Sequence, residues 1–159
     1  MASKEEIDVL IVDDDASIRS LLCVAISRLG LNCNTAVDGE DALEKMTTTD
    51  YAVILLDLMM PRIDGREFVA RLNELERATS HRPVIVMMTA FPASHRLPVP
   101  DERVHLVVQK PFDVIALSEL VYDSVKASRR RTSAGSFTGL PHRASPATDS
   151  TFVGMAPRR

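Results

Sequence analysis

Residues 51–57 read Tyr-Ala-Val-Ile-Leu-Leu-Asp, an unbroken run of apolar and aromatic residues that ends in a carboxylate. A continuous run of this kind predicts a short strand that is buried on both faces, as in a parallel sheet. Asp57 then stands at the carboxyl end of the strand, where open α/β sheets bind their ligands. The stretch therefore predicts a core strand and a functional residue together.

Four other apolar runs alternate with segments of helical periodicity. This alternation predicts an α/β fold in which a five-stranded parallel sheet carries helices on both faces. The predicted strands are residues 7–12, 31–37, 51–56, 83–88 and 104–109, and the predicted helices are residues 18–29, 39–47, 66–78 and a last helix that begins after Asp113. One unit is irregular, because residues 91–103 contain three prolines and an interior proline breaks a helix. We expect the fourth helix to be short or irregular.

Composition divides the chain into two parts. Of the 159 residues, 45% are hydrophobic and 26% are charged, as in globular domains. Residues 1–124 hold 12 basic and 21 acidic residues, whereas residues 125–159 hold 7 basic residues and 1 acidic residue. After about residue 128 the chain is rich in Ser, Thr, Gly, Ala, Pro and Arg, which is typical of disorder. We expect a folded domain over residues 5–127 and a disordered basic tail over residues 128–159, without a DNA-binding domain.

The sequence also predicts a compartment. The apolar runs are far shorter than the roughly 20 residues that span a bilayer, and the first residues lack the apolar core of a signal peptide. Cys23 and Cys33 are too few for a secreted-type disulfide framework, and neither lies in a Cys-x-x-Cys motif. We expect a soluble, cytoplasmic chain without a membrane span, in which both cysteines are reduced.

The residues that end the predicted strands share one chemistry. Asp13 and Asp14 follow the first strand, Asp57 the third, Thr89 the fourth and Lys110 the fifth. Carboxylates that are pushed together repel one another, and a divalent cation removes that repulsion. Oxygen ligands without His or Cys favour Mg²⁺, and a lysine and a hydroxyl suit an anionic phosphoryl group. An aspartate in such a place can act as the nucleophile of phosphoryl transfer.

Each of these residues has an ordinary explanation when it is taken alone. The acidic run 13–15 could be a solvated loop, and Asp15 is best explained as the cap of the first helix. Asp57 could be a turn residue, and Lys110 could be a solvated charge. The four strand ends together favour a site.

Four short motifs carry these residues: Val12-Asp13-Asp14, residues 57–65 (Asp-Leu-Met-Met-Pro-Arg-Ile-Asp-Gly), Met88-Thr89-Ala90 and Lys110-Pro111-Phe112. In this order and spacing they resemble the signature of response-regulator receiver domains of two-component signalling. The resemblance covers about residues 5–127. It implies a flavodoxin-like, doubly wound sheet with strand order 2-1-3-4-5.

The resemblance implies a phospho-acceptor and a metal site. Asp57 would accept the phosphoryl group. Asp14, Asp57 and the main-chain carbonyl of Met59 would hold Mg²⁺, and Asp13 would assist through a metal-bound water.

The resemblance also implies how the phosphoryl group is sensed. Lys110 would contact the phosphoryl oxygens, and a cis peptide bond between Lys110 and Pro111 would aim its side chain. Thr89 would turn inward to bond the phosphoryl group, and Gly65 would tolerate a positive φ in the turn before the third helix.

The implied function is a phosphorylation-dependent signalling switch. It would take its phosphoryl group from a sensor histidine kinase or a histidine phosphotransfer protein. It would catalyse only its own phosphorylation and dephosphorylation, so it is not an enzyme on an outside substrate. Because no effector domain is expected, its output would be a protein–protein interaction with a downstream target.

Three residues depart from the pattern or tune it. The family usually has an aromatic residue three positions before the lysine, and here that residue is Val107. Met59 and Phe91, two residues after Asp57 and Thr89, stand where this family tunes the loss of the phosphoryl group. Both are bulky and apolar and should hinder the approach of water to that group, so we expect slow self-dephosphorylation. Val107 also leaves open a pseudo-receiver, a constitutive interaction module without phosphorylation.

Overall fold

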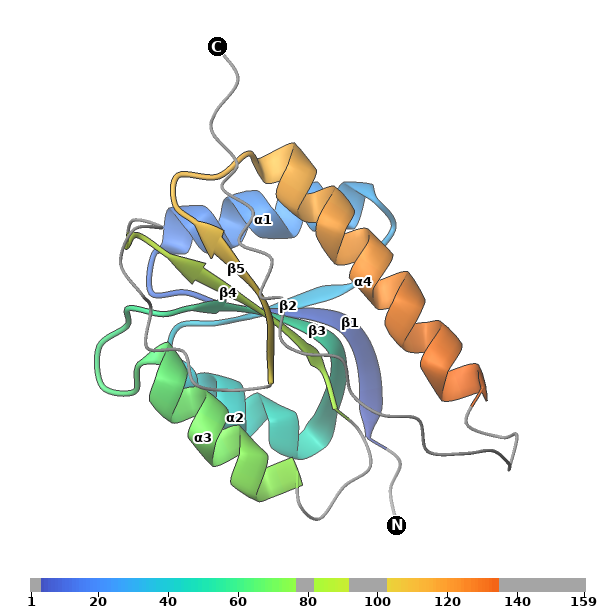
Figure 1. The fold of residues 1–159 in the computed structure, drawn as a ribbon, viewed down its shortest axis with the longest axis horizontal. Coiled ribbons are helices and arrows are strands. Elements are labelled where there is room, and N and C mark those ends of the chain that lie inside the picture. The colour runs from blue at the N-terminus through green and yellow to red at the C-terminus, as the bar shows by residue number, and fades with distance from the viewer. Residues whose placement is uncertain (1–3, 77–81, 92–102, 135–159) are drawn as a thin grey trace, which may run out of the picture.

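The fold of this computed structural model is described for residues 4–76, 82–91 and 103–134. Its sheet has five parallel strands in the order β2-β1-β3-β4-β5. The strands are β1 (Glu5–Val12), β2 (Cys33–Ala36), β3 (Thr49–Asp57), β4 (Val84–Thr89) and β5 (Val104–Gln109). The predicted fold class and strand order are confirmed (Figure 1).

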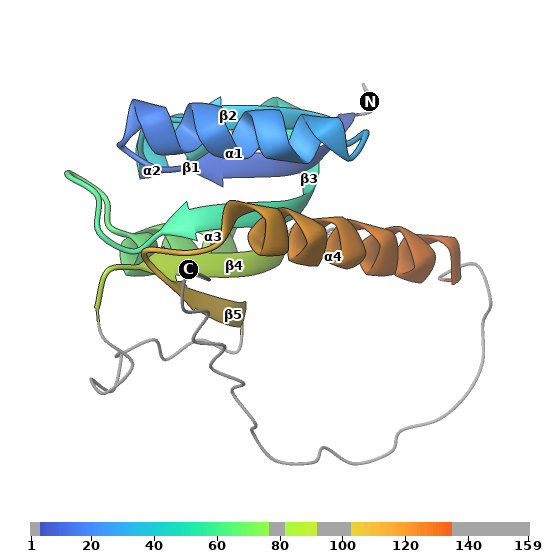
Figure 2. The same cartoon turned by 90° about the horizontal axis from the view of Figure 1, so that it is seen from above.

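Two helices cover each face of the sheet. The helices are α1 (Ala16–Arg28), α2 (Gly39–Thr48), α3 (Gly65–Glu76) and α4 (Val114–Ala134). Figures 1 and 2 show α1 and α4 on one face and α2 and α3 on the other. None of the helices within the described ranges is long and apolar enough to cross a membrane.

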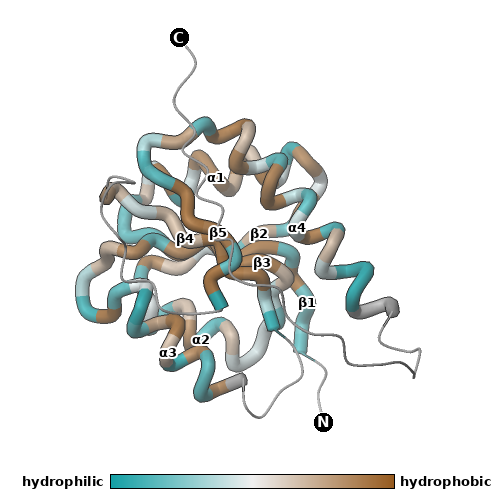
Figure 3. Tube along the Cα trace, in the orientation of Figure 1, coloured by the Kyte–Doolittle hydropathy of each residue, from teal (hydrophilic) through white to brown (hydrophobic). Residues whose placement is uncertain are grey.

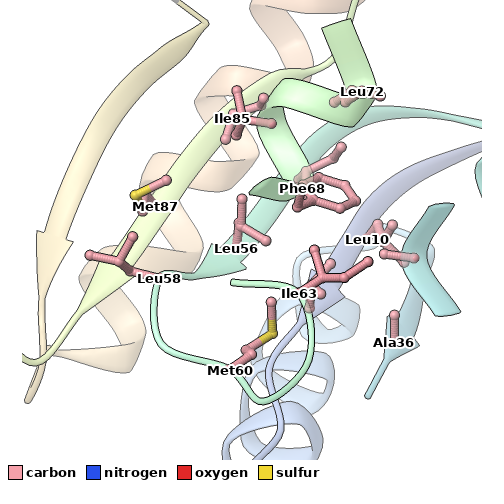
Figure 4. Close-up of a cluster of buried hydrophobic side chains, with 14 of the residues drawn as sticks. Leu10, Ala36, Leu56, Leu58, Met60, Ile63, Phe68, Leu72, Ile85 and Met87 are labelled. Atoms are coloured by element: carbon pink, nitrogen blue, oxygen red, sulfur yellow. The ribbon is translucent and has the colours of Figure 1, made fainter. Parts of the chain in front are cut away.

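The alternation of side chains along β3 builds two cores. Ile54 and Leu56 face α2 and α3, where they pack with Phe68 and other fully buried residues (Figure 4). Val53 and Leu55 face α1 and α4 in a second cluster. Figure 3 shows the hydrophobic residues gathered in the strands at the centre of the molecule. Because β3 is buried on both faces, its last residue is held firmly at the sheet edge.

Local capping fixes where α1 begins and ends. The Asp15 carboxylate accepts hydrogen bonds from the main-chain N–H groups of Ser17 (2.8 Å) and Ile18 (3.3 Å), as an N-cap does. After α1, Gly30 has φ +77°, which favours glycine. The predicted cap at Asp15 is therefore confirmed, and α1 starts directly beside the acidic residues.

The last helix is longer than expected. It continues to Ala134, whereas the folded domain was expected to end at residue 127 and disorder to begin at residue 128. Arg129 on this extension forms an ion pair with the buried carboxylate of Asp8 in β1, so the extension is attached to the sheet. Residues 135–159 of the expected tail lie outside the described residues, as do residues 92–102, where the short or irregular fourth helix was expected.

The expectation of two reduced cysteines is wrong. Cys23 in α1 and Cys33 in β2 form a disulfide with a Cα–Cα distance of 6.2 Å. The prediction used cysteine number and motif spacing, whereas this pairing arises because the second half of α1 packs beside the edge strand.

Candidate functional site

The carboxyl ends of β1 and β3 bring three carboxylates together. Val12 pairs with Leu56 in the register of the two strands, so the residues that follow them lie side by side. Asp13, Asp14 and Asp57 each place a carboxylate oxygen within 4.8 Å of the others. Asp13 and Asp57 are buried and Asp14 is exposed. An oxygen-only cluster with one solvent-facing member fits Mg²⁺, which keeps several of its waters.

Lys110 supplies the positive charge of this site. Its Nζ lies 2.8 Å from Asp13 Oδ2 and 3.4 Å from Asp57 Oδ2. The main-chain N–H of Lys110 donates to the Thr89 carbonyl at 2.6 Å, which fixes the residue against the end of β4. The Lys110–Pro111 peptide bond is cis, as the resemblance implies. The lysine is thus placed where it can touch both buried carboxylates or an anion bound between them.

Burial and charge perturb the acid and the base. Burial raises the pKa of Asp57 from 3.8 to about 6, the charge of Lys110 acts against this rise, and the charge of Asp13 adds to it. For Lys110, burial opposes the charged form, but the hydrogen bond to Asp13 and the charge of Asp57 prevail and raise the pKa of the ammonium. Asp57 is therefore a carboxylate at neutral pH, but one whose charge is costly until a cation compensates it.

Thr89 ends β4 as a fully buried residue. Its Oγ1 accepts a hydrogen bond from the main-chain N–H of Phe91 at 3.1 Å. No residue of the described ranges accepts a hydrogen bond from its hydroxyl, so the proton is available to an incoming acceptor oxygen.

The loop after Asp57 is held by main-chain hydrogen bonds at both of its ends. The main-chain N–H of Met59 donates to Asp57 Oδ1 at 3.2 Å, and the N–H of Gly65 donates to the Leu58 carbonyl at 3.0 Å. Figure 4 shows Leu58, Met60 and Ile63 of this loop packed against the core. The main chain of this loop therefore fixes the orientation of the Asp57 side chain.

Gly65 is needed for space and not for a positive φ, so the expected reason for this glycine is wrong. A Cβ at this position would lie 2.9 Å from the Asp57 carbonyl oxygen and 3.0 Å from Leu58 Cα. The non-glycine residue with positive φ in this loop is Arg62 (φ 68°), whose guanidinium pairs with the buried Asp38.

Arg19 is a site residue that the sequence analysis missed. Its Nη1 donates to the main-chain carbonyl of Asp13 at 2.7 Å, and the N–H of Asp15 donates to Asp13 Oδ1 at 2.9 Å. The position of Arg19 one helical turn after the Asp15 cap was the available signal, because residues four apart share a helix face.

Apolar side chains stand at the rim. Met59 is 55% exposed and Phe91 is 42% exposed. Val107 is half-buried and packs against the core cluster under α2 and α3. Exposed apolar residues are therefore bonded through their main chain to two buried site residues, Met59 to Asp57 and Phe91 to Thr89.

Three comparisons with known proteins agree. A sequence model of the response regulator receiver domain matches residues 9–122. The chain is 34% identical over 137 residues to the transcriptional regulatory protein ResD of Bacillus subtilis (strain 168). The matched region covers 86% of this chain and 54% of ResD. The CheY-like response regulator receiver domain protein of Methanospirillum hungatei JF-1 has a TM-score of 0.65 at 31% identity, covering 77% of this chain and 97% of that chain.

A further solved structure bears on the metal. Response regulator protein TrrA of Thermotoga maritima, solved in complex with Mg²⁺-BeF, has a TM-score of 0.62 at 28% identity, covering 76% of this chain and 98% of that chain. The chain spans about half the length of the curated relatives it matches. The pseudo-receiver alternative finds no support in these matches.

Proposed function

We propose that this chain, which belongs to the response-regulator receiver domain family of two-component systems, is a switch that accepts a phosphoryl group on Asp57. The observation that carries the proposal is the position of Lys110 Nζ, 2.8 Å from Asp13 and 3.4 Å from Asp57, beside carboxylates within 4.8 Å of one another. A nucleophile, a metal-ligand set and an anion-binding cation therefore share one sheet edge.

The phosphoryl donor is a phosphohistidine of a sensor histidine kinase or a histidine phosphotransfer protein. One carboxylate oxygen of Asp57 attacks the phosphorus, the P–N bond breaks, and the imidazole nitrogen of the donor keeps the electron pair. The Lys110 ammonium neutralises charge on the transferred oxygens. Because the pKa of Asp57 is about 6, the nucleophile is already deprotonated at neutral pH.

Receiver domains bind Mg²⁺ at their acidic pocket, and this donor set fits that ion. Asp14, Asp57 and the main-chain carbonyl of Met59 would hold Mg²⁺, with Asp13 assisting through a water. When it is bound, Mg²⁺ neutralises the clustered carboxylates and the phosphoryl oxygens. Asp13 is fixed for this role by Lys110 and by the N–H of Asp15.

The switch acts through Thr89. In the phosphorylated state the Thr89 hydroxyl donates to a phosphoryl oxygen and draws the end of β4 toward Asp57. Val107 carries no ring that could move together with it, so the rearrangement is smaller than in a receiver with an aromatic residue there. The output is a contact with a downstream protein, and the chain catalyses only its own phosphorylation and dephosphorylation. A cytoplasmic location stays a prediction.

Intact-mass spectrometry with Mg²⁺ and acetyl phosphate tests the proposal. The wild type should gain one phosphoryl group, and Asp57→Asn should gain none. Asp64→Asn is the matched control, because Asp64 is an acidic residue of the same loop and caps α3; it should be labelled like the wild type. Absence of labelling together with absence of beryllofluoride binding would contradict the proposal.

A further inference from the structure

The Cys23–Cys33 disulfide joins α1 to β2, two elements that a short loop connects along the chain. Cys23 lies in the second half of α1, and Cys33 is the first residue of β2. Both are half-buried and pack at the margin of the core between α1 and the sheet. Neither cysteine belongs to the acidic site: Cys33 pairs with Val9 of β1, whereas the acidic residues follow the carboxyl ends of β1 and β3.

Cys33 can be reached from solvent. A hollow of about 630 Å³ lies at the amino-terminal edge of β1 and β2. Its lining includes Cys33, Ser27, Gly30 and Asn32. The Ser27 hydroxyl lies 4.0 Å from Cys33 Sγ, and the Cys23 carbonyl lies 3.8 Å from it. A small thiol or disulfide therefore has space and polar partners beside this sulfur.

The fold does not depend on the bond. β2 is an edge strand of four residues that pairs with β1 alone. Most residues of the two core clusters come from β1, β3, β4 and the helices, and β2 contributes one buried residue, Ala36. A domain of this size buries a sufficient core without disulfides. Short edge elements also open locally at low cost, so the sulfurs can exchange while the rest of the domain stays folded.

We propose that Cys23 and Cys33 form a reversible redox site that exchanges with small thiols and disulfides of the glutathione class. In the oxidising direction, the Cys33 thiolate attacks one sulfur of the small disulfide and releases one small thiolate. The Cys23 thiolate then attacks the Cys33 sulfur of the mixed disulfide and releases the second. Two electrons pass from the protein to the small disulfide. This chemistry is independent of phosphorylation on Asp57.

Oxidation tethers α1 to β2. The cysteines are 10 residues apart, and closing a loop of that length restricts the unfolded chain. The expected effect is roughly a hundred-fold shift of the folding equilibrium toward the native state. Locally, the second half of α1 and β2 should exchange their amide protons more slowly when the bond is closed.

The test uses the full chain, reduced with dithiothreitol and then placed in equimolar reduced and oxidised glutathione. Alkylation followed by mass spectrometry should show a protein that has lost two hydrogen atoms and carries no alkyl group. Fresh dithiothreitol should restore two alkylatable thiols while circular dichroism stays native. Thiols that stay free in the glutathione buffer would overturn the proposal, as would a disulfide that opens only in denaturant.

Cys23→Ser and Cys33→Ser are matched controls for each other. Each should stop at a mixed disulfide with one glutathione, and their urea unfolding should not respond to oxidation as the wild type does. If a variant fails to fold, the oxidised and reduced forms of the wild type still test the proposal. Equal urea midpoints for these two forms would contradict the tether.

Discussion

Replacing Asp57 by asparagine should stabilise the metal-free protein at neutral pH. Asp57 is 4% exposed. The pKa of its carboxyl group is raised to about 6 mainly by burial, with the charge of Lys110 opposing the rise and the charge of Asp13 adding to it. Asparagine keeps the size of the side chain and removes its charge. Lys110 also lies 2.8 Å from Asp13, so removing the charge of Asp57 should not leave a buried cation without a counter-charge.

The size of the effect follows from the change in pKa. A rise from 3.8 to about 6 is worth about 3 kcal/mol, since one unit corresponds to about 1.4 kcal/mol. Because the native state binds more protons than the unfolded state between these two values, the free energy of unfolding falls as the pH rises through that window. The gain from asparagine should be absent near pH 3 and reach about 1–3 kcal/mol above about pH 7.

Urea denaturation in EDTA, repeated from acid to neutral pH, measures this gain. Added Mg²⁺ should stabilise the wild type more than Asp57→Asn and so narrow the difference. Asp64→Asn is a control of opposite sign, because the pKa of Asp64 is lowered by the N–H of Glu67, with a contribution from Arg66; it should not gain stability at neutral pH. A metal-free Asp57→Asn protein that is no more stable than the wild type at pH 7 would refute the reasoning.

Three further predictions concern the rim, the loop and the extended helix. Met59→Ala and Phe91→Ala should each speed loss of the phosphoryl group several-fold, because they clear the approach of water; loss of half the wild-type label within a minute would contradict the shielding role. Gly65→Ala should cost about 1–3 kcal/mol in urea unfolding, because its Cβ would lie 2.9 Å from main chain; an unchanged midpoint would show that the loop yields freely. Arg129→Ala should lower the free energy of unfolding by about 1–3 kcal/mol, because it removes the ion pair of the buried Asp8; the exposure of the arginine to solvent limits the loss. A double-mutant cycle with Asp8→Asn should show coupling between the two residues, and purely additive effects would argue against the pair.

The sheet and the acidic site could be predicted because their signals are local. A continuous apolar run predicts a strand such as β3, and the functional residue at the end of the strand directly follows that run in the sequence. Parallel pairing then brings the ends of β1, β3 and β5 to one edge of the sheet, whatever the conformation of the loops. Asp13, Asp57 and Lys110 were therefore placed together without knowledge of any side-chain contact.

Contacts that join distant elements could not be predicted in this way. Arg62 pairs with Asp38 across 24 residues, and Arg129 pairs with Asp8 across 121 residues. Composition predicted disorder after residue 128. It contains no information on the ion pair between an arginine of the continuing helix and a buried carboxylate of β1. The disulfide was missed for the same reason, since it depends on how α1 packs beside β2.

Strand β1 carries one buried carboxylate within it, Asp8, and a second directly after it, Asp13. The cations that neutralise them come from the other end of the domain: Arg129 lies 121 residues after Asp8, and Lys110 lies 97 residues after Asp13. During synthesis the first strand is thus made long before its counter-charges. A nascent chain that stops short of Lys110 holds two acids that have main-chain hydrogen bonds but neither of their counter-charges. We therefore expect the domain to stay open on the ribosome and to close in one late, cooperative step.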